Sequence, residues 1–230
     1  MKIIDALLDA VFPRRCVLCR QVLETKEESG LCALCRWEDY RCPNPETERG
    51  RSSLIYEDRL QQAIYRLKYE GMKDYAACMA HWMMEEGGRW AAEKHFDCLT
   101  AVPLAEKRMK SRGYNQAEEI ARALSRLCRV PYRNLLVRVQ ETRPQSGLGE
   151  MMRRQNVAQA FETAEAEIVP RRICLIDDIM TTGSTLEACM QTLNNRWPDA
   201  EIWYWVLTVR ESEQISANFL QGTLDNLTGV

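Results

Sequence analysis

The sequence predicts an α/β domain with an open, mainly parallel sheet, preceded by a small cysteine-rich module. An apolar, strand-like run over 172–176 ends at two carboxylates and a Thr/Gly/Ser turn, and a helical pattern follows over about 184–196. A β-rich run over 202–209 comes next, and a right-handed crossover would place it beside the first strand in parallel. With 230 residues and 46% hydrophobic content, the chain is long enough for both parts.

The first twelve residues have apolar side chains at helical spacing, which predicts a short amphipathic helix that Pro13 ends. Asp5 and Asp9 interrupt the apolar positions and no small-residue cleavage site follows, so the segment does not match a secretory signal. No apolar run reaches the length of a membrane span. We therefore expect a cytoplasmic protein without membrane insertion.

Two Cys-x-x-Cys pairs form the clearest motif of the N-terminal part, and their members are Cys16, Cys19, Cys32 and Cys35. Two residues between thiolates let one turn present both sulfurs to a cation, and two such turns complete a tetrahedral site for Zn2+. Four thiolates leave no open coordination position, so the zinc is expected to be structural. The alternatives are free thiols or a redox pair. Five other cysteines lie in apolar segments typical of buried thiols, namely Cys78, Cys98, Cys128, Cys174 and Cys189.

A stretch rich in Pro, Asn, Glu and Gly over 41–53 indicates a module boundary. We expect an N-terminal helix and zinc module over 1–48, a main domain over 49–211, and a polar tail over 212–230 that is at least partly disordered.

The first half of the main domain is expected to contain a short strand over 53–56, a helix capped by Asp58, and a second helix over about 73–92. A strand over 98–102 then ends at Pro103. His81 and His95 are isolated from any ligand cluster, so neither is assigned a catalytic role.

A basic loop over 107–116 follows Pro103 and leads into a helix that runs to about Arg129. A loop at the carboxyl end of a strand is where open α/β sheets place ligand-binding groups. Residues 101–160 carry 12 basic and 5 acidic side chains, and the basic ones are nearly all arginine, which suits phosphate recognition. For the arginines within the predicted helix, at positions 122, 126 and 129, a solvated surface is the preferred interpretation.

The segment over 142–149 is too rich in Gly and Pro for regular structure. It is long, polar and basic, so we favour a mobile lid over a simple hairpin connection. A short strand over 158–161 is expected after it.

The turn after the strand over 172–176 has the composition of a phosphate site, because its backbone N–H groups and the first turn of the next helix point at one spot. Hydroxyl donors and a glycine that allows close backbone approach complete the site: Thr181, Thr182, Gly183, Ser184 and Thr185. Asp177 and Asp178 would repel a phosphate, so they are expected to accept hydrogen bonds from sugar hydroxyls or to organise a divalent cation. A phosphorylated sugar satisfies both halves of the site.

The segment over 176–185 resembles the signature with which type I phosphoribosyltransferases bind 5-phosphoribosyl 1-diphosphate (PRPP). The order of motifs along the chain is similar to that of the ComF family, also called GntX-like or amidophosphoribosyltransferase-like proteins. The resemblance covers nearly all of 7–210. Its pieces are the two cysteine pairs, Leu67-Lys68-Tyr69 with Gly71, Val102-Pro103-Leu104, Arg112-Gly113-Tyr114-Asn115-Gln116, Thr142-Arg143 with Gln145, Arg154 with Asn156 and Val157, and the loop itself.

The resemblance implies the type I phosphoribosyltransferase fold and the role of each part of the site. Residues 181–185 would hold the 5′-phosphate, with Asp177 and Asp178 on the ribose hydroxyls. The pyrophosphate, bridged by Mg2+, would face Pro103, Lys107, Arg108 and Arg112. Arg143 and Gln145 would belong to the lid that excludes water while pyrophosphate is displaced at the anomeric carbon.

At one position that bears on catalysis, the sequence departs from the pattern of related enzymes. Purine enzymes of the hypoxanthine-guanine type carry an Asp where this chain has Thr181, and a threonine cannot act as a general base near neutral pH. Three functions therefore stay open: transfer of phosphoribosyl to an unknown acceptor, a PRPP-responsive regulator without turnover, and a non-catalytic single-stranded DNA-binding component of the DNA-uptake apparatus. The ComF resemblance implies natural transformation and a competence helicase as partner.

Overall fold

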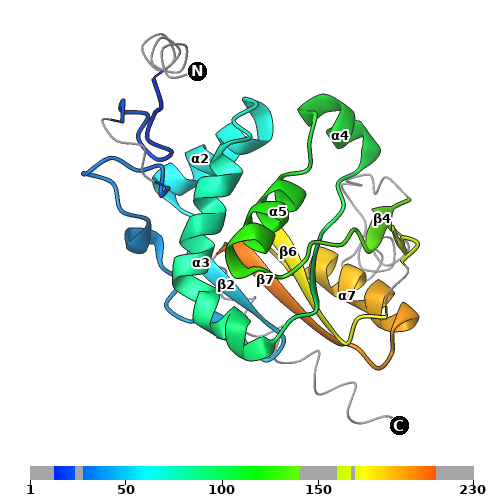
Figure 1. The fold of residues 1–230 in the computed structure, drawn as a ribbon. Coiled ribbons are helices and arrows are strands. Elements are labelled where there is room, and N and C mark those ends of the chain that lie inside the picture. The colour runs from blue at the N-terminus through cyan, green and yellow to red at the C-terminus, as the bar shows by residue number, and fades with distance from the viewer. Residues whose placement is uncertain (1–12, 24–27, 140–159, 167–168, 211–230) are drawn as a thin grey trace, which may run out of the picture.

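The protein is built around a five-stranded sheet with the strand order β1-β2-β7-β6-β3 (Figure 1). The computed structural model describes residues 13–23, 28–139, 160–166 and 169–210. The strands of this sheet are β1 (Glu46–Thr47), β2 (Gly50–Ile55), β3 (Cys98–Ala101), β6 (Arg172–Met180) and β7 (Glu201–Val209). Strand β1 pairs antiparallel with β2, and all other pairs are parallel. This arrangement confirms the expected α/β fold with a mainly parallel sheet.

Helices cover both faces of the sheet. One face packs against α2 (Asp58–Tyr69), α3 (Tyr75–Lys94) and α5 (Gln116–Cys128), and the other against α7 (Ser184–Arg196) (Figure 1). Strand β4 (Leu136–Arg138) pairs with β5 (Phe161–Thr163), which lies beside α7. Alternate residues of β6 enter the two cores, so even-numbered residues 174 and 176 face α2, α3 and α5, and odd-numbered residues 173 and 175 face α7. Burial on both faces explains why these strands are apolar runs.

The carboxyl ends of the parallel strands meet along one edge of the sheet. The residue after β3, Val102, donates its N–H to the carbonyl of Ile176 at 3.0 Å. Arg210, after β7, donates to the carbonyl of Met180 at 3.0 Å, and Tyr56, after β2, donates to that of Val209 at 2.8 Å. The loops that leave these strands therefore begin side by side.

Two strands are longer than expected. Strand β6 does not end before the acidic pair but continues to Met180, because β7 keeps pairing with it as far as Val209. Strand β2 begins at Gly50, inside the stretch predicted to be a linker, because the side chain of Arg51 is buried and donates to Glu46 at 2.7 Å and to the carbonyl of Glu86 at 2.7 Å.

The predicted loop over 107–116 is wrong in its first half, which forms helix α4 (Glu106–Arg112). Gly113 ends that helix with a φ of 79°, a conformation that glycine adopts without strain. Asp58 does not cap α2, since it is the first helical residue and makes no capping hydrogen bond. Three other elements shift by a few residues: α3 covers 75–94 rather than 73–92, β3 ends at 101, and β5 covers 161–163 rather than 158–161. The helix over 184–196 is confirmed at both ends.

The cysteine-rich module shares a core with the main domain. Residues 16–18, Leu31 and Cys35 belong to the same buried cluster as α2 and α3, and a short 3-10 helix, η1 (Trp37–Tyr40), connects the module to β1. The predicted boundary between 48 and 49 falls within the β1–β2 hairpin; the division into parts stays a prediction.

The expected N-terminal helix, the lid with Arg143 and Gln145, and the tail over 212–230 lie outside the described residues. Among the described helices, none has the length and apolar character that crossing a membrane requires.

Candidate functional site

The turn between β6 and α7 brings together the residues predicted to bind phosphate. Gly183 precedes α7 with a φ of 78°, and its carbonyl accepts the N–H of Glu187 at 2.9 Å. The hydroxyls of Thr182 and Ser184 are 3.0 Å apart, and Thr181 and Thr182 are exposed. The first turn of a helix leaves backbone N–H groups without helical partners, so donors from the backbone and side chains surround one exposed position. This arrangement suits a phosphate monoester.

The two carboxylates before the turn leave β6 on opposite faces of the sheet, because side chains alternate along a strand. Asp178 faces α2, where Lys68 contacts it. Asp177 faces α7, where its charge is the second cause, after burial, of the raised pKa of Cys189. The carboxylate of Asp177 also accepts the N–H of Asp178 at 2.8 Å. The pair therefore presents its acids on the two sides of the strand rather than as one acidic surface.

Lys68 was not predicted as a site residue, although it lies in a motif that carried the resemblance. Its Nζ is 2.9 Å from Oδ1 of Asp178, and both side chains are largely buried, with 17% and 10% of their surface exposed. Thr208 of β7 adds a second long-range contact, since its hydroxyl donates to the carbonyl of Asp178 at 3.1 Å. Helix α2 and β7 thus fix the orientation of Asp178, and the only sequence signal for the lysine is the Leu67-Lys68-Tyr69 motif.

Asp177 has an unusual environment for a carboxylate. Burial and, to a smaller extent, the neighbouring Asp178 carboxylate raise its pKa to about 8, although the Asp178 N–H and Lys68 act in the opposite direction. A carboxyl with this pKa changes protonation near neutral pH. Asp177 is therefore able to donate or accept a hydrogen bond at a ligand hydroxyl, depending on pH.

The predicted pyrophosphate side begins directly after β3. Pro103 follows the strand, and α4 carries Lys107, Arg108 and Arg112. In this structure Arg112 is turned toward α2, because its guanidinium donates to the Tyr69 hydroxyl at 2.9 Å and to Oε1 of Gln116 at 2.7 Å.

The rest of the Arg112–Gln116 motif also makes contacts within the protein. The Tyr114 hydroxyl donates to the carbonyl of Leu67 on α2. Asn115 caps α5 by accepting the Ala117 N–H at 3.1 Å, and its amide donates to the carbonyl of Val102 at 2.9 Å. The motif predicted as a ligand-facing loop therefore joins α4 and α5 to α2 and to the end of β3, which fixes the relative positions of the site's elements.

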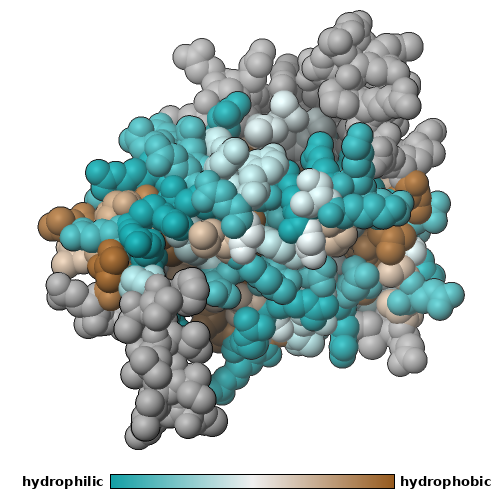
Figure 2. Space-filling view, turned by 90° about the horizontal axis from the view of Figure 1, so that it is seen from above, coloured by the Kyte–Doolittle hydropathy of each residue, from teal (hydrophilic) through white to brown (hydrophobic). Residues whose placement is uncertain are grey.

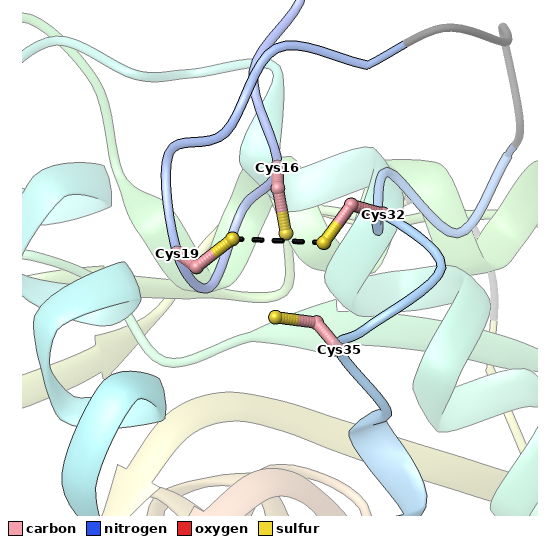
Figure 3. A group of neighbouring side chains, drawn as sticks. All are labelled: Cys16, Cys19, Cys32 and Cys35. Atoms are coloured by element: carbon pink, nitrogen blue, oxygen red, sulfur yellow. Dashed lines mark hydrogen bonds between the residues drawn. The ribbon is translucent and has the colours of Figure 1, made fainter.

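The four cysteines of the N-terminal pairs converge on one point (Figure 3). All four sulfurs lie within 4.8 Å of one another, and those of Cys19 and Cys32 are 3.6 Å apart. In a tetrahedral site with Zn–S bonds of about 2.3 Å, neighbouring sulfurs are about 3.8 Å apart, so the cluster fits a zinc ion. The cysteines are free thiols, and a disulfide would need a far shorter distance. The predicted ligand set is thus brought together, and a metal would join the two turns.

The thiols of the cluster differ in their acidity. Burial and the neighbouring Cys19 thiol raise the pKa of Cys35 to about 12. For Cys32 burial acts in the same direction, but hydrogen bonds from the Leu34 N–H and from Cys19 and Cys35 outweigh it and hold the pKa at about 7. Cys32 is therefore the thiol expected to ionise first when a metal binds.

Helix α2 contacts the cysteine cluster through two arginines. Arg66 donates to the carbonyls of Val17 and Leu18, at 2.7 and 3.1 Å, inside the first Cys-x-x-Cys turn. Arg59 lies 3.7 Å from the sulfur of Cys35. Such outer contacts orient metal ligands. Because Lys68 lies two residues after Arg66, one helix contacts both the cysteine cluster and the acidic pair.

The chain is similar to a protein family and to solved structures. The family model described as a phosphoribosyl transferase domain matches residues 109–216. Orotate phosphoribosyltransferase from Aeropyrum pernix is a similar solved structure, with 14% identity, a TM-score of 0.40, and coverage of 80% of this chain and 79% of that one.

Two curated relatives match along almost their whole length. Competence protein F of Haemophilus influenzae is 30% identical over 224 residues, which cover 85% of this chain and 97% of that protein. The DNA utilization protein YhgH of Escherichia coli K12 is 26% identical over 219 residues, which cover 83% and 96%. The chain therefore belongs to the ComF family, and its main domain has the type I phosphoribosyltransferase fold with an N-terminal four-cysteine cluster that fits a zinc module.

Proposed function

We propose that this ComF-family protein binds PRPP at the carboxyl edge of its sheet. The observation that carries the proposal is the junction of β6 and α7, where a turn rich in hydroxyl and N–H donors follows two acidic residues. Residues 181–185 would hold the 5′-phosphate, and Asp177 and Asp178 would accept hydrogen bonds from the ribose hydroxyls. The residues that would face the pyrophosphate are Pro103, Lys107 and Arg108. Arg112 would also face it once its hydrogen bond to the Tyr69 hydroxyl is broken.

A Mg2+ ion bound with PRPP would neutralise part of the pyrophosphate charge and would take most of its ligands from phosphate oxygens and water. This edge of the sheet fits Mg2+, because Asp177 and Asp178 supply carboxylate oxygens, the protein ligands that usually bind this ion. Lys68 keeps the buried Asp178 carboxylate paired with a cation at 2.9 Å.

Transfer to an acceptor is the enzymatic form of this proposal. The bond between the anomeric carbon and pyrophosphate would break, pyrophosphate would leave with its electron pair, and an acceptor of unknown identity would form the new bond. Thr181 is exposed and cannot take a proton from the acceptor. Rate acceleration would therefore rest on stabilisation of the leaving group and exclusion of water, the latter by the proposed lid with Arg143 and Gln145.

Isothermal titration calorimetry with PRPP and MgCl2 tests the binding proposal. We expect binding to the wild type and a loss of at least about 100-fold in the double variant Asp177→Asn, Asp178→Asn, because amides replace both carboxyl groups that would contact the ribose hydroxyls. Glu187→Gln, an acidic residue in the first turn of α7, is a matched control and should bind at least as well as wild type. Equal affinity of the double variant and the wild type would refute this assignment.

A second function is supported by the relatives, whose names refer to competence and DNA utilization. We propose that the protein takes part in DNA uptake by binding single-stranded DNA, with a competence helicase as partner. The excess of 12 basic over 5 acidic side chains in 101–160 favours a phosphate backbone as ligand. Fluorescence anisotropy on single strands at increasing salt should show weakening affinity. Affinity that does not respond to salt would count against this function.

The third function, a PRPP-responsive regulator, differs from the enzyme in its products. Incubation with PRPP, Mg2+ and candidate acceptors, followed by chromatography, distinguishes the two, because only turnover releases pyrophosphate. In each case the zinc ion would be structural and the protein would work in the cytoplasm. None of the ten cysteines, all of which lie in the described part of the chain, is in a disulfide, which is typical of a reducing compartment.

A further inference from the structure

The outer side of α2 carries two exposed aromatic rings. Of the large hydrophobic side chains that are exposed in the described part of the chain, only Tyr65 and Tyr69 are aromatic, with 56% and 59% of their surface exposed. The others are scattered aliphatic residues: Val22, Leu34, Leu127, Val137, Val139 and Val169. Exposed tyrosines that lie together on one helix face are unusual for a surface whose role is only solvation.

The two tyrosines form a column with an arginine. Their ring centroids are 4.9 Å apart with an interplanar angle of 41°. The guanidinium of Arg112 lies 4.7 Å from the centroid of Tyr69 and donates to its hydroxyl at 2.9 Å. Tyr69 is therefore held by Arg112, and Tyr65 packs on Tyr69, so the second ring is supported on one side while most of its surface faces solvent.

Tyr65 borders a hollow on the surface, with a volume of about 390 Å3. The hollow lies along α2 and is lined by Tyr56, Gln61, Gln62, Tyr65, Arg66 and Glu70. The hollow is open to solvent, so it suits one flat ring held against its wall rather than an enclosed ligand. Gln61 already donates to the carbonyl of Tyr56 at 3.0 Å, which fixes its side chain. Glutamine amides present a donor and an acceptor together, as the edges of nucleobases do, so the lining suits a flat polar ring.

The neighbouring helix supplies positive charge. Helix α4, which Arg112 joins to Tyr69, has four basic residues and one acidic residue in seven positions, with the sequence Glu106-Lys107-Arg108-Met109-Lys110-Ser111-Arg112. Figure 2, which views the molecule from above, the side where α2 and α4 lie in Figure 1, shows a largely hydrophilic face with hydrophobic residues toward its margins. An aromatic ring beside a basic helix is the combination by which proteins bind single strands, stacking the bases and pairing the phosphates.

We infer that the hollow beside Tyr65 takes one unpaired base of single-stranded DNA, which stacks on the tyrosine while the adjoining phosphates approach α4. This inference rests on the DNA-binding part of the proposed function and names its surface. Tyr65 lies apart from the acidic pair, which Lys68 of α2 contacts. The basic residues of α4, in contrast, are shared with the proposed pyrophosphate side.

The test is fluorescence anisotropy with the full-length protein and two labelled probes of equal charge, an oligothymidine of about 12 nucleotides and an abasic strand of the same length. One stacked base contributes about 1–3 kcal/mol, so the wild type should bind oligothymidine about 10-fold more tightly than the abasic strand. Tyr65→Ala should remove this preference and leave the affinity for the abasic strand unchanged. Tyr65→Phe should retain the preference, since it keeps the ring. Leu127→Ala, an exposed apolar residue on α5, serves as the control and should behave like wild type.

Photo-crosslinking gives a second measurement that does not depend on a variant. An oligomer containing 5-iodouracil should crosslink to Tyr65 in the wild-type protein, with the site identified by mass spectrometry. The inference is overturned if Tyr65→Ala retains the preference for oligothymidine or if thymidine monophosphate displaces the probe as well as an unlabelled oligomer does. In those cases DNA binding itself survives, whereas absence of wild-type binding to both probes would refute the DNA-binding function as well.

Discussion

The cysteine cluster and the turn between β6 and α7 with its acidic pair are both small polar sites, yet they obtain their geometry in different ways. The four cysteines lie within twenty residues of one another, and two local turns aim them at one point. The acidic pair instead depends on distant segments, since Lys68 reaches Asp178 across 110 positions and Thr208 across 30. The cysteine site is therefore encoded by its own two turns, whereas the site at the sheet edge is positioned by segments that the packed core brings together.

Helix α2 connects the two regions. Arg66 contacts the first Cys-x-x-Cys turn, Leu67 accepts a hydrogen bond from Tyr114, and Lys68 pairs with Asp178. Successive residues of one helical turn therefore contact the cysteine-rich module, the junction of α4 and α5, and the carboxyl edge of the sheet. Loss of the metal module should consequently disturb the site at the sheet edge, while loss of the acidic pair should leave the cysteines in place.

The largest effect is expected when the cluster is broken. Cys16→Ser together with Cys19→Ser should abolish zinc binding, reduce the free energy of unfolding by several kcal/mol, and weaken PRPP binding through α2. Metal content by mass spectrometry and unfolding in urea provide the measurements. Cys128→Ser, a half-buried thiol outside the cluster, is the control. If the double variant retained stoichiometric zinc, the assignment of the site would be wrong.

Removing the cation of the ion pair should have the next largest effect. Lys68→Met leaves the Asp178 carboxylate buried without its partner, which should cost about 2–4 kcal/mol of unfolding free energy. The double variant Lys68→Met, Asp178→Asn should recover most of this loss, because the unpaired charge is gone. Denaturant unfolding of all four members of the cycle measures the coupling energy. A coupling energy near zero would show that the contact contributes nothing.

A smaller effect is expected when the contact between α2 and the first cysteine turn is removed. Arg66→Met removes the donor to two carbonyls of the first cysteine turn and should cost about 1–3 kcal/mol. Zinc should transfer from the Arg66→Met variant to a chromogenic chelator several-fold faster than it does from the wild type. Arg89→Met, an exposed residue of α3, is the comparison variant. Identical release rates for the two variants would contradict a role for α2 in holding the module.

The smallest effect is a change in pH dependence at the sheet edge. Because the pKa of Asp177 is raised to about 8 by burial, the folded protein keeps a proton that the unfolded chain has released above pH 4. Stability should therefore fall as pH rises from about 5 to 8 and level off above that range. Asp177→Asn has no such proton and should lack this slope. Urea unfolding of both proteins across the pH range tests the difference, and parallel curves would contradict it.

The features predictable from the sequence were those coded by neighbouring residues. The cysteine spacing predicted the cluster, the apolar run with its Thr/Gly/Ser turn predicted the strand, turn and helix over 172–196, and Asn115 predicted the start of α5. In each case the pattern of residue types lies within one short stretch of the chain, so the local order of residue types was sufficient.

Only the tertiary structure decided how these parts meet. Strand β6 runs through the acidic pair because β7 continues to pair with it, and this register sends Asp177 toward α7 and Asp178 toward α2. Packing of α2 on the sheet then supplies Lys68, and the Arg112–Gln116 motif contacts α2 instead of forming an open basic loop. Pairing of this kind joins segments that lie 30 to 110 residues apart, and no local pattern specifies which distant segment arrives.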